Sequence, residues 1–261
     1  MSQNYSRLSA VIITFNEENN IADCIESLLP VADDIVVVDS NSTDRTREIC
    51  MNYRVRFIEQ PFLGYVEQKN FAARQAGYAY VLSLDADERL SQKLQAAILA
   101  EKQKSFPFKG YTMNRLNNYC GQWIKHGDYY PDIKLRLWHS EYGEWKGNNP
   151  HDKLELSANT SLEHLKGDLL HYSFRSYQEH IHQMNRFSTI AAQTLFKTGK
   201  KPSVFKPLLS SWWAFFGGYF FRLGFLDGAN GYAIAKNNSL YAYYKYAKLN
   251  ELYKKDNAGE G

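Results

Sequence analysis

The sequence predicts an α/β fold with a mostly parallel sheet, because short β-branched, apolar segments alternate with helix-like segments through the first half of the chain. The expected strands cover residues 8–14, 34–39, 54–59 and 78–84, and the expected helices cover residues 17–29, 43–51 and 66–76. This alternation is typical of βαβ crossovers. We therefore expect a doubly wound, Rossmann-like sheet.

Polar residues follow three of the expected strands, at positions 14–17, 39–44 and 85–88. Ligands of open α/β sheets bind outside the carboxyl ends of the strands. We therefore expect three strand ends to converge on one crevice.

The second half of the chain has a different pattern. Residues 110–145 form short aromatic segments and loops, which predict a mixed-sheet edge, whereas residues 177–196 predict one helix and residues 205–253 at least two more. We expect a first domain over residues 1–175 and an aromatic-rich helical region over residues 176–261. The aromatic residues around Lys206 and Arg222 suit a segment that lies on a bilayer, and packing against the first domain or a dimer contact explains them equally well.

Charge, cysteine content and hydropathy exclude several classes of protein. The net charge of +3 gives no nucleic-acid footprint. Cys24, Cys50 and Cys120 are widely spaced and odd in number, which indicates free thiols in a reducing compartment. The polar N-terminus does not resemble a secretion signal, and no apolar stretch of about 18 residues is long enough to span a bilayer. We therefore expect a cytoplasmic protein.

The acidic turn Asp85-Ala86-Asp87-Glu88 follows an apolar strand. Carboxylate oxygens are the ligands that hard divalent cations prefer, and Mg²⁺ needs only one or two of them when substrate phosphates complete its shell. Asp85 and Asp87 are therefore candidate metal ligands. The alternative is a solvated acidic turn that caps the helix expected after Ser91.

Three segments in this order resemble the inverting glycosyltransferases of family two, which have the GT-A fold: 8–19 (LSAVIITFNEEN), 35–46 (IVVVDSNSTDRT) and 82–88 (LSLDADE). The resemblance implies an α/β nucleotide-sugar-binding domain, a UDP-sugar donor and a divalent cation, Mg²⁺ or Mn²⁺. By this resemblance the donor-site residues are Thr14, Asn16 and Glu17 for the nucleotide pocket, Asp39 for the uracil, Asp85 for the ribose and Asp87 for the metal.

Two of the donor-site residues have simpler explanations. The Asp39 carboxylate suits a base N–H but also suits the cap of the following helix, and we assign that capping role to Ser42 or Thr43 instead. Lys69 is a candidate phosphate ligand, although a lysine on a helix is usually only solvated.

An inverting transfer needs a base that deprotonates the acceptor hydroxyl. The segment 149–154 (NPHDKL) resembles a His-Glu-x-Leu segment of one bacterial branch of the family, with Asp152 where that branch has Glu. Asp152 is our candidate base, with His151 as a residue that orients it. A turn-forming role for Asp152, or Glu155 as the base, is the alternative.

The roles of two further residues, Arg136 and His171, have alternative explanations. The segment 132–139 (DIKLRLWH) resembles the Arg-Leu strand of the same branch, so Arg136 either binds phosphate or an acidic acceptor from the cleft or forms a surface ion pair. His171 is a candidate late metal ligand, although no spacing rule establishes it.

Within that branch the likeness extends to lipopolysaccharide core enzymes that add a β-linked glucose to an inner-core heptose. It implies UDP-glucose as donor, a lipid-linked saccharide acceptor and a peripheral position at the inner face of the bacterial inner membrane. The alternatives are another cell-surface glycan acceptor, a nucleotidyltransferase and a noncatalytic module that binds the membrane surface. A nucleotidyltransferase would carry a Gly-rich basic loop after the first strand, where this chain has the acidic segment 14–18 (TFNEE).

Overall fold

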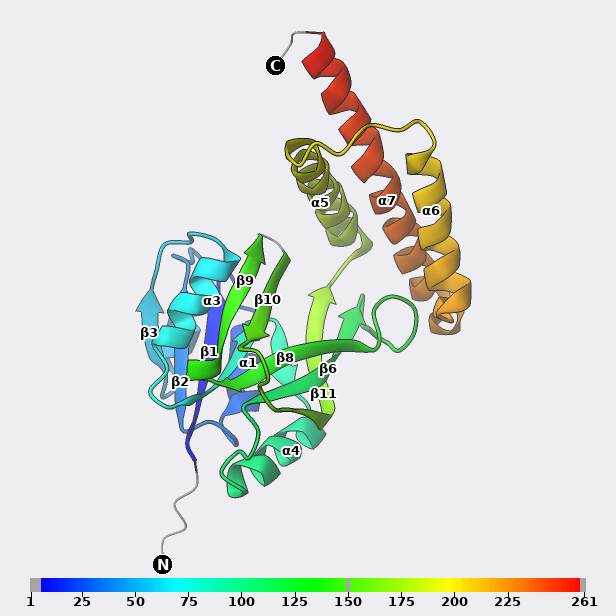
Figure 1. Cartoon of the computed structure of the whole chain (residues 1–261). Coiled ribbons are helices and arrows are strands. Elements are labelled where there is room, and N and C mark those ends of the chain that lie inside the picture. The colour runs from blue at the N-terminus through cyan, green and yellow to red at the C-terminus, as the bar shows by residue number, and fades with distance from the viewer. Residues whose placement is uncertain (1–5, 149–150, 259–261) are drawn as a thin grey trace, which may run out of the picture. The chain divides into compact units, whose positions relative to one another are not determined.

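The computed structural model describes residues 6–148 and 151–258, and it has the α/β fold that the sequence predicts (Figure 1). The described residues up to 115, with residues 133–171, form a first compact unit. Residues 116–132 and those from 172 onward form a second. The sequence did not predict that residues 116–132 group with the C-terminal helices.

The parallel part of the sheet contains β2 (Asp34–Asp39), β1 (Leu8–Thr14) and β4 (Tyr80–Asp85), with β3 (Arg56–Glu59) beyond β2. Beyond β4 the order continues through β8 (Asp132–His139), β6 (Gly110–Tyr119), β11 (Leu162–Phe174) and β5 (Glu88–Leu90). Strand β8 is antiparallel to β4, β5 is antiparallel to β11, and β7 (Gln122–Ile124) pairs with β6. The sheet is therefore mixed, as expected, but β8 and β6 lie inside it and not at its edge, because β11 and β5 continue the sheet beyond them. A separate hairpin contains β9 (Gly143–Asn148) and β10 (His151–Leu156).

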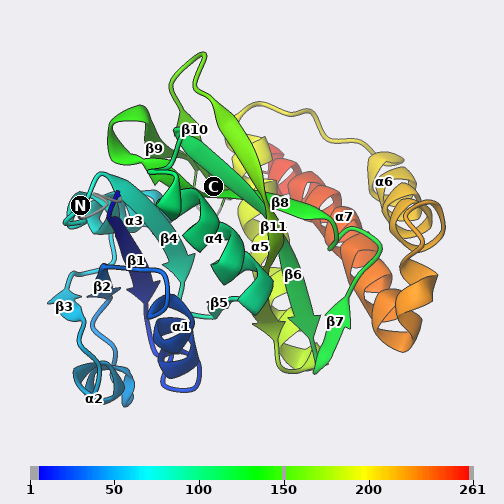
Figure 2. The same cartoon turned by 90° about the horizontal axis from the view of Figure 1, so that it is seen from below.

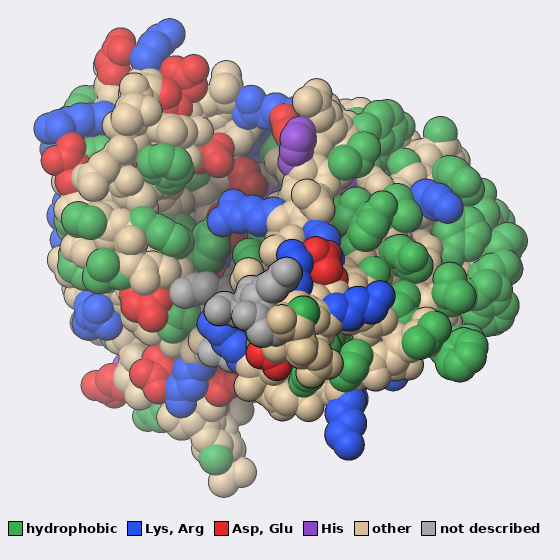
Figure 3. All heavy atoms as spheres, turned by 90° about the horizontal axis from the view of Figure 1, so that it is seen from above, with side chains coloured by type: hydrophobic (Ala, Val, Ile, Leu, Met, Phe, Trp, Pro, Cys, Tyr) green, Lys and Arg blue, Asp and Glu red, His purple; other side chains and the backbone are tan. Residues whose placement is uncertain are grey.

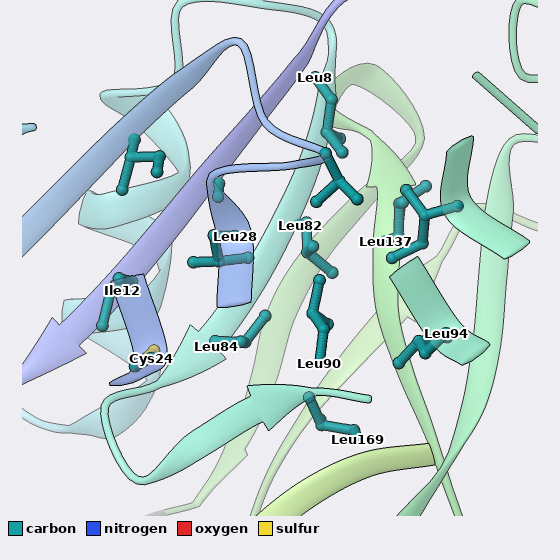
Figure 4. Close-up of a cluster of buried hydrophobic side chains, with 14 of the residues drawn as sticks. Leu8, Ile12, Cys24, Leu28, Leu82, Leu84, Leu90, Leu94, Leu137 and Leu169 are labelled. Carbon is teal, nitrogen blue, oxygen red and sulfur yellow. The ribbon is translucent and has the colours of Figure 1, made fainter. Parts of the chain in front are cut away.

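Alternation along β1 gives the first unit a hydrophobic core on each face of the sheet. Leu8, Ala10 and Ile12 pack with buried residues of α1 (Ile21–Leu28) and α4 (Gln92–Gln103), and Figure 4 shows part of this cluster. Figure 2 shows α1 and α4 beside the strands that they cover. Val11 packs in a second cluster with Ala72 of α3 (Tyr65–Arg74). This two-sided burial fixes the strands whose carboxyl ends carry the polar residues.

The second unit is built from α5 (Tyr177–Lys197), α6 (Lys206–Phe216) and α7 (Gly228–Asn257). A π-helical turn (Gly217–Phe221) and a 3₁₀ turn (Gly224–Asp227) connect α6 to α7. The expected helix at 177–196 and the two expected in 205–253 are confirmed. Within the described residues, no helix is long and apolar enough to cross a bilayer.

One local prediction and one local alternative, both about helix caps, are wrong. Helix α2 (Thr46–Met51) begins after Arg45, and neither Ser42 nor Thr43 caps it; Asp44 Oδ1 accepts from the N–H of Thr46 at 3.0 Å instead. The acidic turn at 85–88 does not cap α4 either, because β5 intervenes and Ser91 caps that helix by accepting from the N–H of Leu94. In both places a contact with another segment takes the polar side chain.

Candidate functional site

The order β2-β1-β4 brings the predicted strand ends together at one edge of the sheet. Thr14 pairs with Asp39 across β1 and β2, and Ile13 pairs with Asp85 across β1 and β4. Because the three strands are parallel, their carboxyl ends lie at the same edge. The expected convergence of the residues that follow them is therefore confirmed.

The loops after β1 and β2 are joined by hydrogen bonds through Asn16 and Glu17. Asn16 has a left-handed backbone (φ 55°), and its N–H donates to Ser42 Oγ at 2.8 Å while its Oδ1 accepts from the N–H of Thr43 at 2.8 Å. The N–H of Glu17 donates to Thr46 Oγ1 at 2.8 Å. These contacts hold the loops in one geometry before any ligand binds.

Asp39 and Thr14 are buried below these loops. Asp39 is 2% exposed, and its two carboxylate oxygens accept from the N–H of Ser42 at 2.7 Å and from Ser42 Oγ at 2.5 Å. The contact with Ser42 explains why neither residue caps α2. Thr14 Oγ1 is buried without a hydrogen-bond partner among the described residues.

Lys69 and Arg136 surround the Asp85 carboxylate. Lys69 Nζ lies 3.1 Å from Asp85 Oδ1, and Arg136 Nη2 donates to Asp85 Oδ2 at 3.0 Å. Both cations are buried, Lys69 at 4% and Arg136 at 3% exposure, and both lie over the ring of Trp145. The solvated-lysine explanation of Lys69 and the surface-ion-pair explanation of Arg136 are therefore wrong.

Glu88 completes this ion cluster, and the sequence reasoning did not assign it a role. It is fully buried, its Oε1 accepts from Arg136 Nη2 at 2.8 Å and its Oε2 accepts from the N–H of Asp85 at 3.0 Å. Arg115 Nη1 lies 3.5 Å from the same Oε1. A third acid in the turn 85–88 was the signal that could have revealed this position.

Opposite charges in the cluster stabilise the ionised forms of Asp85 and Arg136. Burial alone would raise the pKa of the Asp85 carboxyl, but the charges of Lys69 and Arg136 outweigh it and hold that pKa well below its usual range. Burial would lower the pKa of Arg136, whereas Glu88 and Asp85 raise it above the usual guanidinium value. Both groups therefore stay charged at neutral pH.

Asp152 reaches the same cluster from β10. Its Oδ2 lies 2.8 Å from Lys69 Nζ, so Lys69 links the candidate base to Asp85. Asp152 lines a cavity of about 440 Å³ together with Asp85, whereas Glu155 lines a different one. The side chain of His151 lies outside the described residues. The geometry thus separates Asp152 from the alternative base.

Asp87 pairs with a residue from the last strand of the first unit. Its Oδ2 lies 3.2 Å from His171 Nε2 on β11. In the described part of the chain, no three His, Cys, Asp or Glu side chains gather as a ready-made metal site. A carboxylate and an imidazole are nevertheless a suitable pair of ligands for a divalent cation whose remaining ligands come from water and phosphate.

Comparison with known proteins identifies the family. Residues 9–165 match the model of glycosyl transferase family 2. The chain belongs to this family. This glycosyltransferase is 32% identical to an uncharacterized glycosyltransferase of Rickettsia typhi over 94% of this chain and 87% of the relative. It is 30% identical to the lipopolysaccharide core biosynthesis glycosyltransferase LpsC of Rhizobium meliloti over 93% of this chain and 91% of the relative.

Solved structures show weaker likeness to this glycosyltransferase. The crystal structure of Staphylococcus aureus TarS 1–349 aligns with a TM-score of 0.45 at 15% identity, over 96% of this chain and 92% of that one. Glucosyl-3-phosphoglycerate synthase from Mycobacterium tuberculosis, in complex with Mn²⁺, UDP and glucosyl-3-phosphoglycerate, aligns with a TM-score of 0.36 at 19% identity. That alignment covers 43% of this chain and 44% of the synthase.

Proposed function

We propose that this glycosyltransferase is an inverting, metal-dependent enzyme that transfers glucose from UDP-glucose to an inner-core heptose of lipopolysaccharide. The observation that carries the proposal is the position of Asp152, which lines one cavity with Asp85 and shares Lys69 with it. A general base and a donor-binding carboxylate must lie this close for one hydroxyl to attack a bound sugar. The name of the Rhizobium meliloti relative supports the acceptor class.

In the proposed reaction the acceptor oxygen attacks the anomeric carbon as Asp152 accepts the hydroxyl proton. The new glycosidic bond forms on the face opposite the diphosphate, so the bond to the donor oxygen breaks, UDP leaves with that electron pair and the configuration inverts. Thr14, Asn16, Glu17 and Asp39 bind the nucleoside, Asp39 at the uracil, and Asp85 accepts from the ribose. Lys69 and Arg136 supply positive charge near the diphosphate.

Within the acidic turn, Asp87 is the residue that suits a metal ion. Asp87 and His171 would hold the cation, which supplies positive charge to the leaving diphosphate. Asp85 is occupied by Lys69 and Arg136, so its role as a metal ligand requires those ion pairs to rearrange. We therefore assign Asp87 to the metal and Asp85 first to the donor and to Lys69.

The charge of the cavity supports an anionic acceptor. Its charged lining residues are Lys69, Arg115, Lys134, Arg136 and Lys153, with Asp85 and Asp152. These are five cations against two carboxylates in the lining, and the buried Glu88 behind Arg115 and Arg136 is a third. A doubly charged diphosphate with a divalent cation adds no net charge. The remaining positive charge favours a saccharide that carries phosphate or carboxylate. We place the enzyme at the cytoplasmic face of the inner membrane, the position that its resemblance to lipopolysaccharide core enzymes implies.

The test is release of UDP from nucleotide sugars by the purified chain, with and without Mn²⁺ or Mg²⁺. We expect slow, metal-dependent release from UDP-glucose, lost in Asp87→Ala. Asp152→Asn should lower the rate about 100-fold or more, as removal of a general base does, and leave UDP binding intact. Glu155→Gln is the matched control on the same strand. A rate lost in Glu155→Gln but kept in Asp152→Asn would make Glu155 the base, and no metal-dependent UDP binding would overturn the donor site.

A further inference from the structure

Helix α6 is amphipathic in the opposite sense to a helix on the surface of a water-soluble protein. Its serines face α7: Ser210 Oγ donates to the carbonyl of Lys206 on its own helix at 2.7 Å and lies 3.3 Å from the carbonyl oxygen of Ala242, and Ser211 Oγ lies 2.8 Å from Ser239 Oγ. Four of its large apolar side chains are more than half exposed, namely Leu208, Leu209, Trp212 and Trp213, whereas Phe215 packs on Tyr232 of α7. Pro207 is its one buried residue within the described chain. A helix that turns its serines inward and its tryptophans outward is suited to apolar surroundings.

The outward side chains form one continuous face, which we call the aromatic face. The spacing of residues 205, 208, 209, 212 and 213 places them along one side of the helix, and the turns after α6 extend the face. Its members and their exposure are Phe205 (73%), Leu208 (62%), Leu209 (67%), Trp212 (56%), Trp213 (63%), Phe221 (69%), Phe225 (42%) and Leu226 (56%). Figure 3 shows hydrophobic side chains gathered over this part of the chain. Scattered apolar residues are normal on a protein surface, but a contiguous patch marks an interaction site.

The charges beside the aromatic face identify what covers it. From residue 197 to residue 226 the sequence contains five basic residues, Lys197, Lys200, Lys201, Lys206 and Arg222, and no Asp or Glu. An anionic bilayer complements this combination, because aromatic rings occupy the headgroup region and lysines pair with lipid phosphates. A symmetric dimer through the same face would instead bring like charges together.

We propose that the aromatic face docks the chain onto an anionic lipid bilayer, with α6 in the plane of the interface. The rings of Trp212, Trp213 and Phe221 enter the boundary between headgroups and acyl chains, and the lysines before α6 contact the headgroups. A lipid-linked acceptor would then lie in the same bilayer to which the enzyme is bound. This inference does not depend on the identity of the donor or of the catalytic base.

The experiment is cosedimentation of the full chain with vesicles of phosphatidylcholine alone or with about 30 mol% phosphatidylglycerol. The wild-type chain should bind the anionic vesicles and release in about 0.5 M salt to the level seen with neutral ones. Leu209→Ser with Trp213→Ser should weaken binding by at least about tenfold. Lys200→Ala with Lys201→Ala should weaken binding only to the anionic vesicles.

The matched control is Leu29→Ser with Leu63→Ser, two leucines that are 50% and 70% exposed in the first unit, and it should bind as the wild type does. Circular dichroism checks that each variant keeps its fold. Equal binding by the aromatic-face variant and the control, or no vesicle binding by the wild type, would overturn the proposal. So would light scattering that shows a dimer for the wild type and a monomer for Leu209→Ser with Trp213→Ser, since the face would then bind a second copy.

Discussion

His180 of α5 is a buried imidazole held as a hydrogen-bond acceptor. It is 5% exposed, its Nδ1 accepts from Asn237 Nδ2 at 2.9 Å and lies 2.9 Å from the hydroxyl of Tyr119, and its ring stacks on Phe174. Burial lowers its pKa to about 4, and a proton on Nδ1 would also meet the amide donor of Asn237. The folded chain therefore keeps His180 neutral.

The stability of the folded chain should fall in mild acid because of this residue. The unfolded imidazole has a pKa of about 6.5, so between pH of about 6.5 and 4 the unfolded state binds more protons than the folded one. The stabilisation is complete above pH 6.5 and is lost as the pH falls toward 4. We expect urea unfolding to show a loss of about 1–2 kcal/mol at pH 5 relative to pH 7.5. In His180→Asn, which keeps an acceptor but does not titrate, this part of the loss should disappear, and an equal loss in both proteins would refute the assignment.

Lys69 shows why the sequence indicated the residues of the proposed donor site better than it indicated their contacts. Asp85 and Asp87 belong to a local motif, and the strand pattern alone places them at the edge of the sheet. The partners of Lys69 are 16 and 83 residues away, at Asp85 and Asp152, and the second contact depends on the hairpin of β9 and β10, which the sequence did not predict. A lysine on a helix has no local signal that distinguishes burial from solvation.

At the scale of elements, the turns after α6 pack against α7 through glycines. A Cβ at Gly231 of α7 would lie 1.9 Å from the carbonyl oxygen of Gly224, whereas a Cβ at Gly217 would meet nothing within 4 Å. Neither residue has a positive φ, so the two positions differ in space rather than in backbone strain.

Gly231→Ala should therefore destabilise the chain by about 2–4 kcal/mol, because the helix must move away from a backbone atom that cannot give way. Gly217→Ala should be neutral or stabilise by up to about 1 kcal/mol through helix propensity. Denaturant unfolding of both variants measures the difference. Similar free energies of unfolding for the two would mean that α7 and the 3₁₀ turn do not approach this closely.

The elements themselves were predictable where one local pattern decides them. The β-branched segments 8–14 and 34–39 form β1 and β2 as expected, and the start of α5 after Ser176 is signalled by a serine that accepts from the N–H of Glu179. The start of α2 was not predictable, because Ser42 and Thr43 have good capping side chains but bind Asp39 and Asn16 instead. The long strand β11 was missed, since its pairing with β5 and its place beside β6 are nonlocal.

At the scale of the whole molecule, the two proposed activities belong to different units. The proposed donor-site residues Thr14, Asp39, Asp85 and Asp87 lie in the first unit with the proposed base Asp152, and the aromatic face lies in the second. Sequence motifs indicated the proposed donor site, because its residues directly follow strands that a local pattern predicts. The sequence could not show that the aromatic face of α6 points away from α7. That direction follows from the contacts of Ser210 and Ser211 with α7.

This separation predicts that donor binding and membrane binding can be removed independently. UDP with Mn²⁺ at about 100 times its dissociation constant should stabilise the wild type by about 2.7 kcal/mol, which is a rise in Tm of about 5–10 °C in thermal unfolding. Asp87→Ala should lose the part of this rise that needs Mn²⁺ while still binding anionic vesicles. Leu209→Ser with Trp213→Ser should show the reverse, and Glu163→Ala, at an exposed acid, should keep both. Loss of both properties in either variant would mean that the two units do not act independently, whereas the reciprocal pattern would assign nucleotide binding to the strand ends and lipid binding to α6.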